Sequence, residues 1–163
     1  MPYDIDPIVS VDSMTLVWGI RKEGPEEQCL RAKWLFGQFT KRRTQVIVSA
    51  VAVSEYLTAI EQASHASVIA EMEKRFLIMP FNEHCASLAA SLFQMGLKMR
   101  LKNEPGGRPI LRADTMVVAT AKTFGAGTLY SGDDACRRLA IKAGLKALDL
   151  PEPERDLFRD IIE

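Results

Sequence analysis

The sequence is poor in the residues from which disulfide frameworks and zinc sites are built. It has three cysteines among 163 residues, and no two of them form a CxxC pair. It also has only two histidines, His65 and His84, which show no pairing with an acid in the sequence pattern. These shortages exclude a disulfide scaffold and disfavour a zinc centre, and they favour a reducing compartment. We therefore expect a cytoplasmic protein.

Long apolar runs and an excess of one charge are also missing. No run approaches the roughly 20 residues that span a bilayer. The first residues include acids where a signal peptide carries basic residues, so we expect no membrane association. The 21 Lys and Arg residues balance 21 Asp and Glu residues. Overall charge therefore gives no reason to expect nucleic acid as a partner, and any charged binding surface must be local.

What the chain does contain is an alternation of strand and helix patterns. Short apolar runs predict strands at 8–11, 44–50, 76–81, 128–131 and 147–150. Helical spacing or capping residues predict helices at 29–39, 54–76, 83–101, 112–124 and 133–142, with Asn82 as a cap and a loop at 102–109. This order is typical of an α/β protein with a mostly parallel central sheet and helices on both faces. We expect one domain over 1–150 and a tail, 151–163, that can form a short amphipathic helix.

Four acids follow this pattern in a consistent way. Asp12 comes directly after the first strand, and Glu55 is expected in the first turn of the helix after the second strand. Asp114 is expected to open the helix that leads to the fourth strand, and Asp133 lies two residues past that strand. Because ligands of open α/β sheets bind beyond the carboxyl ends of the strands, these acids are predicted to share one edge.

Such a cluster requires a counter-charge. Two carboxylates about 4 Å apart repel by roughly 4 kcal/mol at an effective dielectric near 20. Oxygen ligands without His or Cys suit Mg²⁺ or Mn²⁺, which support phosphodiester hydrolysis. Each acid also has a simpler explanation: Asp12 and Asp114 as helix caps, Asp133 or Asp134 as turn residues, and Glu55 as a surface charge. Only the prediction that all four acids lie at one edge of the sheet favours a metal site.

Four sequence pieces resemble the PIN-domain nucleases, and within them the VapC-type toxins of toxin–antitoxin pairs. They are "VDS" at 11–13, "SEYL" at 54–57, "LRADTMVVATA" at 111–121 and "LYSGDD" at 129–134. The last two are the most specific. The resemblance spans nearly the whole chain, from Val9 to Leu150, and implies a PIN-like three-layer fold.

The resemblance also implies an activity and its residues. It implies a Mg²⁺-dependent endoribonuclease, with Mn²⁺ as a substitute, that cleaves RNA, forms a homodimer and is held inactive by a cognate antitoxin. Asp12 and Asp114 would be the main metal ligands, Glu55 and Asp133 would complete the pocket, and Ser131 would orient Asp133 or hold water. The chain departs from the family at Ala135 and Cys136, where a second acid and an aromatic are common, so Asp134 competes with Asp133 for the fourth role.

Basic residues next to the acids are candidates for RNA contact. Arg112, Arg137 and Arg138 flank the predicted pocket, where they could bind phosphates or could simply lie on solvated helix faces. Two rival functions remain open. One is a catalytically degenerate PIN-like interaction module, against which the presence of all four acids argues. The other is a receiver-like signalling domain, which would need a phosphorylatable Asp and a Lys that the pattern does not supply.

Overall fold

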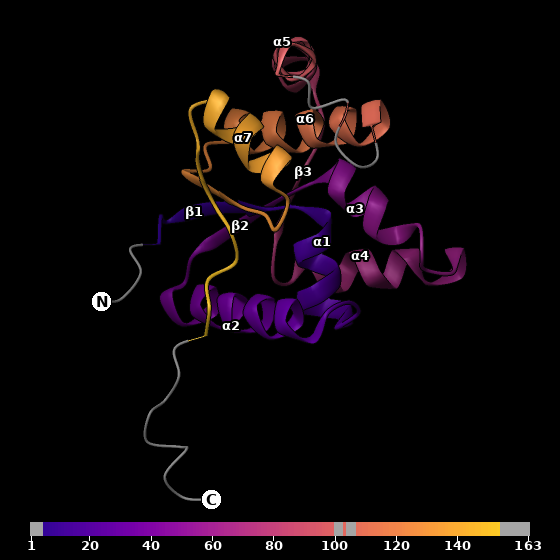
Figure 1. Cartoon of the computed structure of the whole chain (residues 1–163). Helices are drawn as coiled ribbons and strands as arrows, with labels where there is room; N and C mark the ends of the chain where they lie inside the picture. The colour runs from indigo at the N-terminus through magenta and orange to yellow at the C-terminus, as the bar shows by residue number, and fades with distance from the viewer. Residues whose placement is uncertain (1–4, 100–102, 104–106, 154–163) are drawn as a thin grey trace, which may run out of the picture.

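A five-stranded, all-parallel sheet forms the centre of the computed structural model, which describes residues 5–99, 103 and 107–153 (Figure 1). The β-branched and apolar runs that predict strands are buried in it, including Val9, Val48 and Leu129. The strand order is β3-β2-β1-β4-β5. The strands are β1 (Ile8–Val11), β2 (Gln45–Ser49), β3 (Leu77–Met79), β4 (Thr128–Tyr130) and β5 (Lys146–Leu148).

Helices cover both faces of this sheet. In Figure 1, α2 lies across one face, whereas α6 and α7 lie on the other with α5 stacked outside α6. The predicted α/β three-layer architecture is therefore confirmed. The helical elements are α1 (Ser13–Leu16), the π-helical turn η1 (Val17–Arg21), α2 (Glu26–Arg42), α3 (Ala50–Leu57), the 3₁₀ turn η2 (Gln62–Ser64), α4 (His65–Glu73), α5 (Glu83–Lys98), α6 (Gly107–Thr123) and α7 (Asp134–Lys142).

The order of the strands creates one crevice. The chain runs from β1 outward to β2 and β3, then returns to place β4 on the other side of β1. The connections after β1 and β4 consequently leave the sheet on opposite faces, and a gap opens at the carboxyl ends of these two neighbouring strands. Ligands of open α/β sheets bind at such a switch point. The residues that follow Val11 and Tyr130 are therefore candidates for a ligand-binding site.

The continuous helix predicted over 54–76 is wrong. The structure instead has α3 ending at Leu57 and α4 beginning at His65. Two side chains satisfy backbone carbonyls around the break: the Thr58 hydroxyl donates to the Glu55 carbonyl at 2.7 Å, and His65 Nε2 lies 2.9 Å from the Ile60 carbonyl oxygen. Side chains that bond to nearby backbone compete with a helix in this way.

The predicted helix starts around two of the acids are also wrong. Helix α6 begins at Gly107, not at residue 112, so the expected loop at 102–109 is already helical over its last three residues. Pro109 fits because it lies in the first turn, where no intrahelical N–H bond is lost. Asp114 thus lies inside α6 and does not open it, and Glu55 lies beyond the first turn of α3.

One predicted helix cap is confirmed. Asn82 caps α5 by accepting from the Cys85 amide at 3.0 Å, as expected. Most of the predicted tail lies outside the described residues, which end at residue 153. Among the described helices, none combines the length and apolarity needed to cross a bilayer.

Candidate metal-dependent nuclease site

Asp12 is the most buried of the four predicted acids. It is 8% exposed and caps α1 directly after β1. Its Oδ1 accepts hydrogen bonds from the Thr15 amide at 2.9 Å and from the Thr15 hydroxyl at 2.7 Å. Its Oδ2 accepts a hydrogen bond from the Ser131 hydroxyl at the end of β4. Asp12 is therefore a helix cap, as the simpler explanation proposed, and it also lies at the switch point.

Asp114 lies on α6 and faces the same crevice. Its carboxyl is partly buried, and the charges of Asp133, Asp12 and Glu55 act on it. Burial first, and then these three neighbouring charges, raise the pKa of Asp114 to about 8. A carboxyl in solution has a pKa near 4, so the site strongly disfavours a fourth negative charge in the absence of a cation.

Glu55 contributes from α3. Its side chain is exposed at the rim, and its Oε2 accepts a hydrogen bond from the Ser13 hydroxyl at 2.9 Å. Partial desolvation is the main cause that raises its pKa, with a further contribution from the nearby charge of Asp12. The pKa of Asp12 is also raised, and burial is again the main cause. The hydrogen bonds from Ser131 and Thr15 lower this pKa but do not outweigh burial, and the charge of Asp133 raises it further.

Asp133 is fixed by the helix that it caps. Its Oδ1 accepts from the amides of Ala135 at 2.7 Å and Cys136 at 3.2 Å at the start of α7. Its own amide donates to the Ser131 hydroxyl at 3.0 Å. Asp134 instead points toward basic residues, 3.6 Å from Arg137 Nη2 and 3.2 Å from Arg138 Nε. This geometry favours Asp133 over Asp134 as the fourth acid of the pocket.

Ser131 links the acids from the two central strands. Its hydroxyl donates to Asp12 and accepts from the Asp133 amide, and the residue is buried. The Cys136 thiol lies beneath the same pocket, where burial and the charges of Asp114 and Asp12 raise its pKa. Cys136 is therefore held as a thiol at neutral pH.

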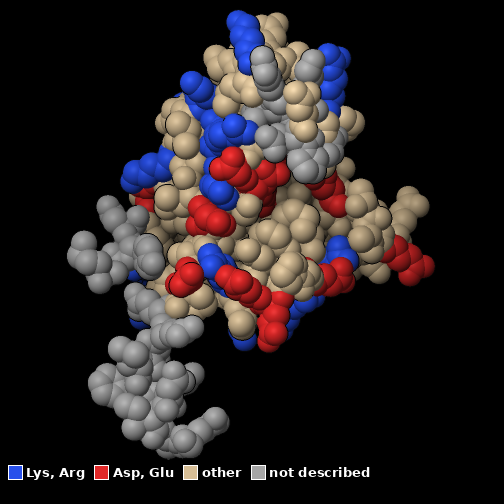
Figure 2. Space-filling model, viewed as in Figure 1, with Lys and Arg blue, Asp and Glu red and all other residues tan. Residues whose placement is uncertain are grey.

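The three arginines predicted to contact phosphate lie in different surroundings. The Arg137 Nη1 donates to the Ser131 carbonyl at 2.7 Å and lies 3.7 Å from Asp149, so it supports the turn that carries the site. Arg138 pairs with Asp134. Arg112 is exposed and stacks over Phe93, with 4.9 Å between the guanidinium carbon and the ring centre. Figure 2 shows the molecule from the same side as Figure 1. Acidic side chains gather near the centre of the face seen there, and Lys and Arg side chains lie toward its upper part.

The donor set suits a hard cation. No three His, Cys, Asp or Glu side chains in the described part of the chain form a complete metal-binding group. Mg²⁺ does not require one, because it commonly binds through one or two carboxylates and keeps several waters. An all-carboxylate pocket in which Asp114 has a pKa of about 8 is also one that a divalent cation would relieve. Asp12 and Asp114 are the residues that would hold it.

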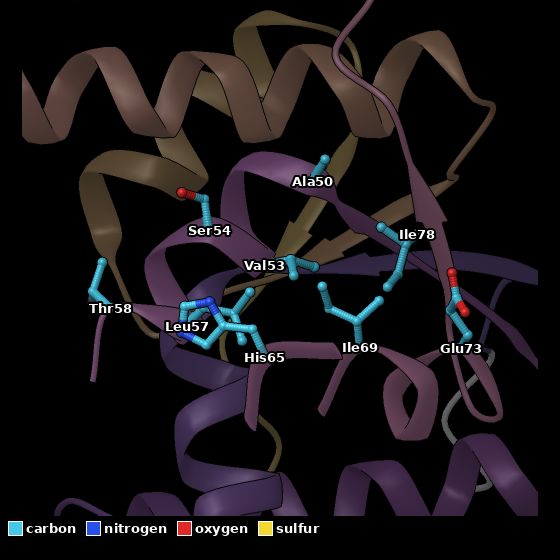
Figure 3. Close-up of a pocket in the computed structure, with 9 residues that line it drawn as sticks. All are labelled: Ala50, Val53, Ser54, Leu57, Thr58, His65, Ile69, Glu73 and Ile78. Atoms are coloured by element: carbon cyan, nitrogen blue, oxygen red, sulfur yellow. The ribbon is translucent and has the colours of Figure 1, made fainter. Parts of the chain in front are cut away.

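A cavity of about 520 Å³ lies on another side of α3. Figure 3 shows apolar side chains of α3, α4 and β3 around it, among them Val53, Ile69 and Ile78. Its rim includes His65, whose Nε2 is already engaged with a backbone carbonyl. None of the four acids lines it. The chemistry of the site therefore belongs to the crevice at the switch point.

Sequence reasoning missed the hydroxyls that hold the acids. Ser13 orients Glu55, and Thr15 donates twice to Asp12, yet neither residue was singled out. For Thr15 the available signal was its position three residues after Asp12, because a capping side chain accepts from the amide two or three residues ahead of it. The partner of Ser13 is 42 residues away in the sequence, so no local signal pointed to that bond.

Solved structures share this fold. A chain of VapBC2 from Rickettsia felis, bound to a promoter DNA fragment, is 15% identical, with a TM-score of 0.61 over 88% of this chain and 99% of that one. Chains of DNA-bound VapBC from Salmonella typhimurium and of VapBC-1 from nontypeable Haemophilus influenzae are 14% and 12% identical. Their TM-scores are 0.58 and 0.56, again over 88% of this chain and 98% of theirs. No family profile matches the sequence, and no curated protein is significantly similar to it. The fold expected from the resemblance to VapC-type toxins is thus confirmed.

Proposed function

We propose that this chain is a Mg²⁺-dependent endoribonuclease and the toxin of a toxin–antitoxin pair. The observation that supports the proposal is that Asp114 is partly buried and that the charges of three acids from other segments, Asp12, Glu55 and Asp133, act on it. Burial first, and then the charges of Asp133, Asp12 and Glu55, raise the pKa of Asp114 to about 8. A divalent cation bound there would offset the repulsion between the carboxylates, so a pocket of this kind favours cation binding.

Each residue has a defined part in this proposal. Asp12 and Asp114 hold the cation, and Glu55 and Asp133 complete the acidic walls of the pocket. A bound Mg²⁺ would acidify a water molecule and stabilise negative charge on the phosphoryl group. Ser131 keeps Asp12 and the Asp133 backbone in register, and Ser13 orients Glu55. Arg137 and Arg138 contact carboxylates, whereas Arg112 is exposed and stacks over Phe93, so we choose Arg112 as the candidate for contact with the RNA backbone.

The structural likeness supports a proposal about the partner of this chain. The three similar chains all come from VapBC complexes. We extend this by proposing that the present chain also binds a cognate antitoxin and acts as a homodimer in the cytoplasm.

The decisive experiment is end-mapping of cellular RNA after induced expression. We expect discrete new 5′ ends with the wild type and none with Asp12→Ala. Glu73→Gln, which removes an exposed carboxylate in the separate cavity beside α4, is the matched control and should cleave as the wild type does. Purified wild-type protein should cleave RNA in Mg²⁺ or Mn²⁺ and stop in EDTA. Cleavage by Asp12→Ala at the wild-type rate would refute the assignment, and an inert wild type would favour an interaction module.

A further inference from the structure

Thr15 donates twice to the same oxygen of Asp12. Its amide and its hydroxyl both reach Oδ1, at 2.9 Å and 2.7 Å. A carboxylate oxygen has two lone-pair sites, so Thr15 occupies both of those on Oδ1. Oδ2 accepts from the Ser131 hydroxyl and keeps a second site. Asp12 therefore presents one oxygen, and not two, to any further ligand.

The Thr15 hydroxyl is not needed for the helix cap. The amide of Thr15 alone would complete the cap, as the Cys85 amide does for Asn82 at the start of α5. Asp133 likewise caps α7 through two backbone amides and receives no side-chain donor in that cap. Thr15 is nevertheless fully buried, with its hydroxyl turned to the carboxylate. The effect of the additional donor is therefore on the Asp12 carboxylate, where it occupies a second site on Oδ1.

We propose that Thr15 is a positioning residue that makes Asp12 a one-oxygen ligand and thereby favours Mg²⁺ over Ca²⁺. The inference rests on the proposed function, because it requires Asp12 to bind a cation. Mg²⁺ demands near-octahedral geometry and binds few carboxylates, whereas Ca²⁺ accepts carboxylates through both oxygens at longer distances. Saturating Oδ1 removes the two-oxygen mode that Ca²⁺ uses.

The test is the ratio of Mg²⁺ to Ca²⁺ affinities, measured by calorimetric or thermal-shift titration of metal-free full-length protein. Thr15→Val is close in shape and removes the hydroxyl. We expect it to weaken Mg²⁺ binding by about 10- to 100-fold, as loss of an outer hydrogen-bond partner commonly does. Because the site that the hydroxyl occupied on Oδ1 is freed, while the hydrogen bond from the amide remains, Ca²⁺ binding should weaken much less. The affinity ratio should consequently shift toward Ca²⁺ by up to about 10- to 100-fold.

Two further variants separate this effect from a general loss of structure. Thr15→Ser keeps the hydroxyl and should keep the wild-type ratio. Thr120→Val removes an equally buried hydroxyl, which bonds to the Met116 carbonyl at 2.8 Å inside α6. It should lower stability without changing the ratio. If Thr15→Val does not fold, Thr15→Ala removes the same donor without adding bulk and takes its place.

The outcomes are distinguishable. An unchanged ratio in Thr15→Val, or an equal shift in Thr15→Ser, would overturn the role of Thr15 and leave the proposed metal site intact. Failure of the wild type to bind any divalent cation would overturn both, and this appears in the wild-type titration before any variant is considered.

Discussion

The Ser131 hydroxyl donates a hydrogen bond to Oδ2 of Asp12, a residue 119 positions away in the sequence. The two residues follow β4 and β1, which are adjacent and parallel in the sheet. Through this one contact the end of β4 sets the position of the carboxylate that follows β1. The same hydroxyl accepts from the Asp133 amide at 3.0 Å, so three of the site's residues form one connected unit.

Asp114→Asn should abolish RNA cleavage and leave the fold intact. The amide cannot replace a charged ligand, so we expect a loss of at least about 100-fold, the upper range seen when mere outer-shell partners are lost. Circular dichroism should match the wild type. RNA cleavage by this variant at the wild-type rate in Mg²⁺ would contradict the assigned role of Asp114.

The stability of the metal-free protein should fall as the pH rises from about 4 to about 8. Asp114 has a pKa of about 8 in the folded chain against an ordinary value of 3.8. Over this interval the folded state holds a proton that the unfolded state has released, so raising the pH favours unfolding. The raised pKa values of Asp12 and Glu55 act in the same direction. Urea denaturation in EDTA at several pH values measures the slope.

Asp114→Asn is the control for that slope. Without the ionisable group the dependence on pH should flatten, and the melting temperature of the metal-free variant at pH 8 should exceed that of the wild type by a few degrees. About 1 kcal/mol corresponds to roughly 2–4 °C in a chain of this size. A variant whose stability falls with pH as steeply as the wild type would show that Asp114 is not the group responsible.

Substitution of Arg137 should lower the stability of the protein, whereas substitution of Arg112 should weaken RNA binding. Arg137→Met removes the bond to the Ser131 carbonyl and should destabilise the protein by about 1–3 kcal/mol. Arg112→Met loses the stacking on Phe93, worth no more than about 1 kcal/mol. It should instead weaken RNA binding and reduce the salt dependence by about 0.7 in the log–log slope. Denaturation and RNA titration across salt concentrations measure the two effects, and equal behaviour of the two variants would argue against this division.

Gly132→Ala should disturb the turn that precedes Asp133. A Cβ atom there would lie 2.7 and 2.8 Å from two atoms of the Trp18 ring. We expect a cost of about 1–3 kcal/mol from this overpacking, together with weaker Mg²⁺ binding. Gly37→Ala is the matched control, because its Cβ meets no atom within 4 Å and it lies inside α2.

The control should gain up to about 1 kcal/mol from the higher helix propensity of alanine. Replacing Trp18 by Leu in the Gly132→Ala background should restore part of the loss. Absence of any such restoration would mean that the cost arises elsewhere in the turn.

The sequence alone was sufficient to predict the alternation of strands and helices in the fold. Buried strands such as β1 and β2 are near-continuous apolar runs, and caps such as Asn82 and Asp133 act through residues close to them in the chain. These signals are local, because burial and capping both depend on a few neighbouring positions. The end of α3 and the start of α6 were mispredicted because apolar spacing continues through 54–76 and because a Pro–Gly segment can also begin a helix.

For the site, the sequence determined which acids follow which strands, and with them the prediction that Asp12, Glu55, Asp114 and Asp133 share one edge. Only the tertiary structure decided how each carboxylate is held: Asp12 by Thr15 and Ser131, Glu55 by Ser13, and Arg137 on a backbone carbonyl instead of facing solvent. The reason is physical. Periodicity specifies where a backbone lies, whereas a hydrogen bond depends on distances of a few tenths of an ångström between groups that the packing of the whole sheet brings together.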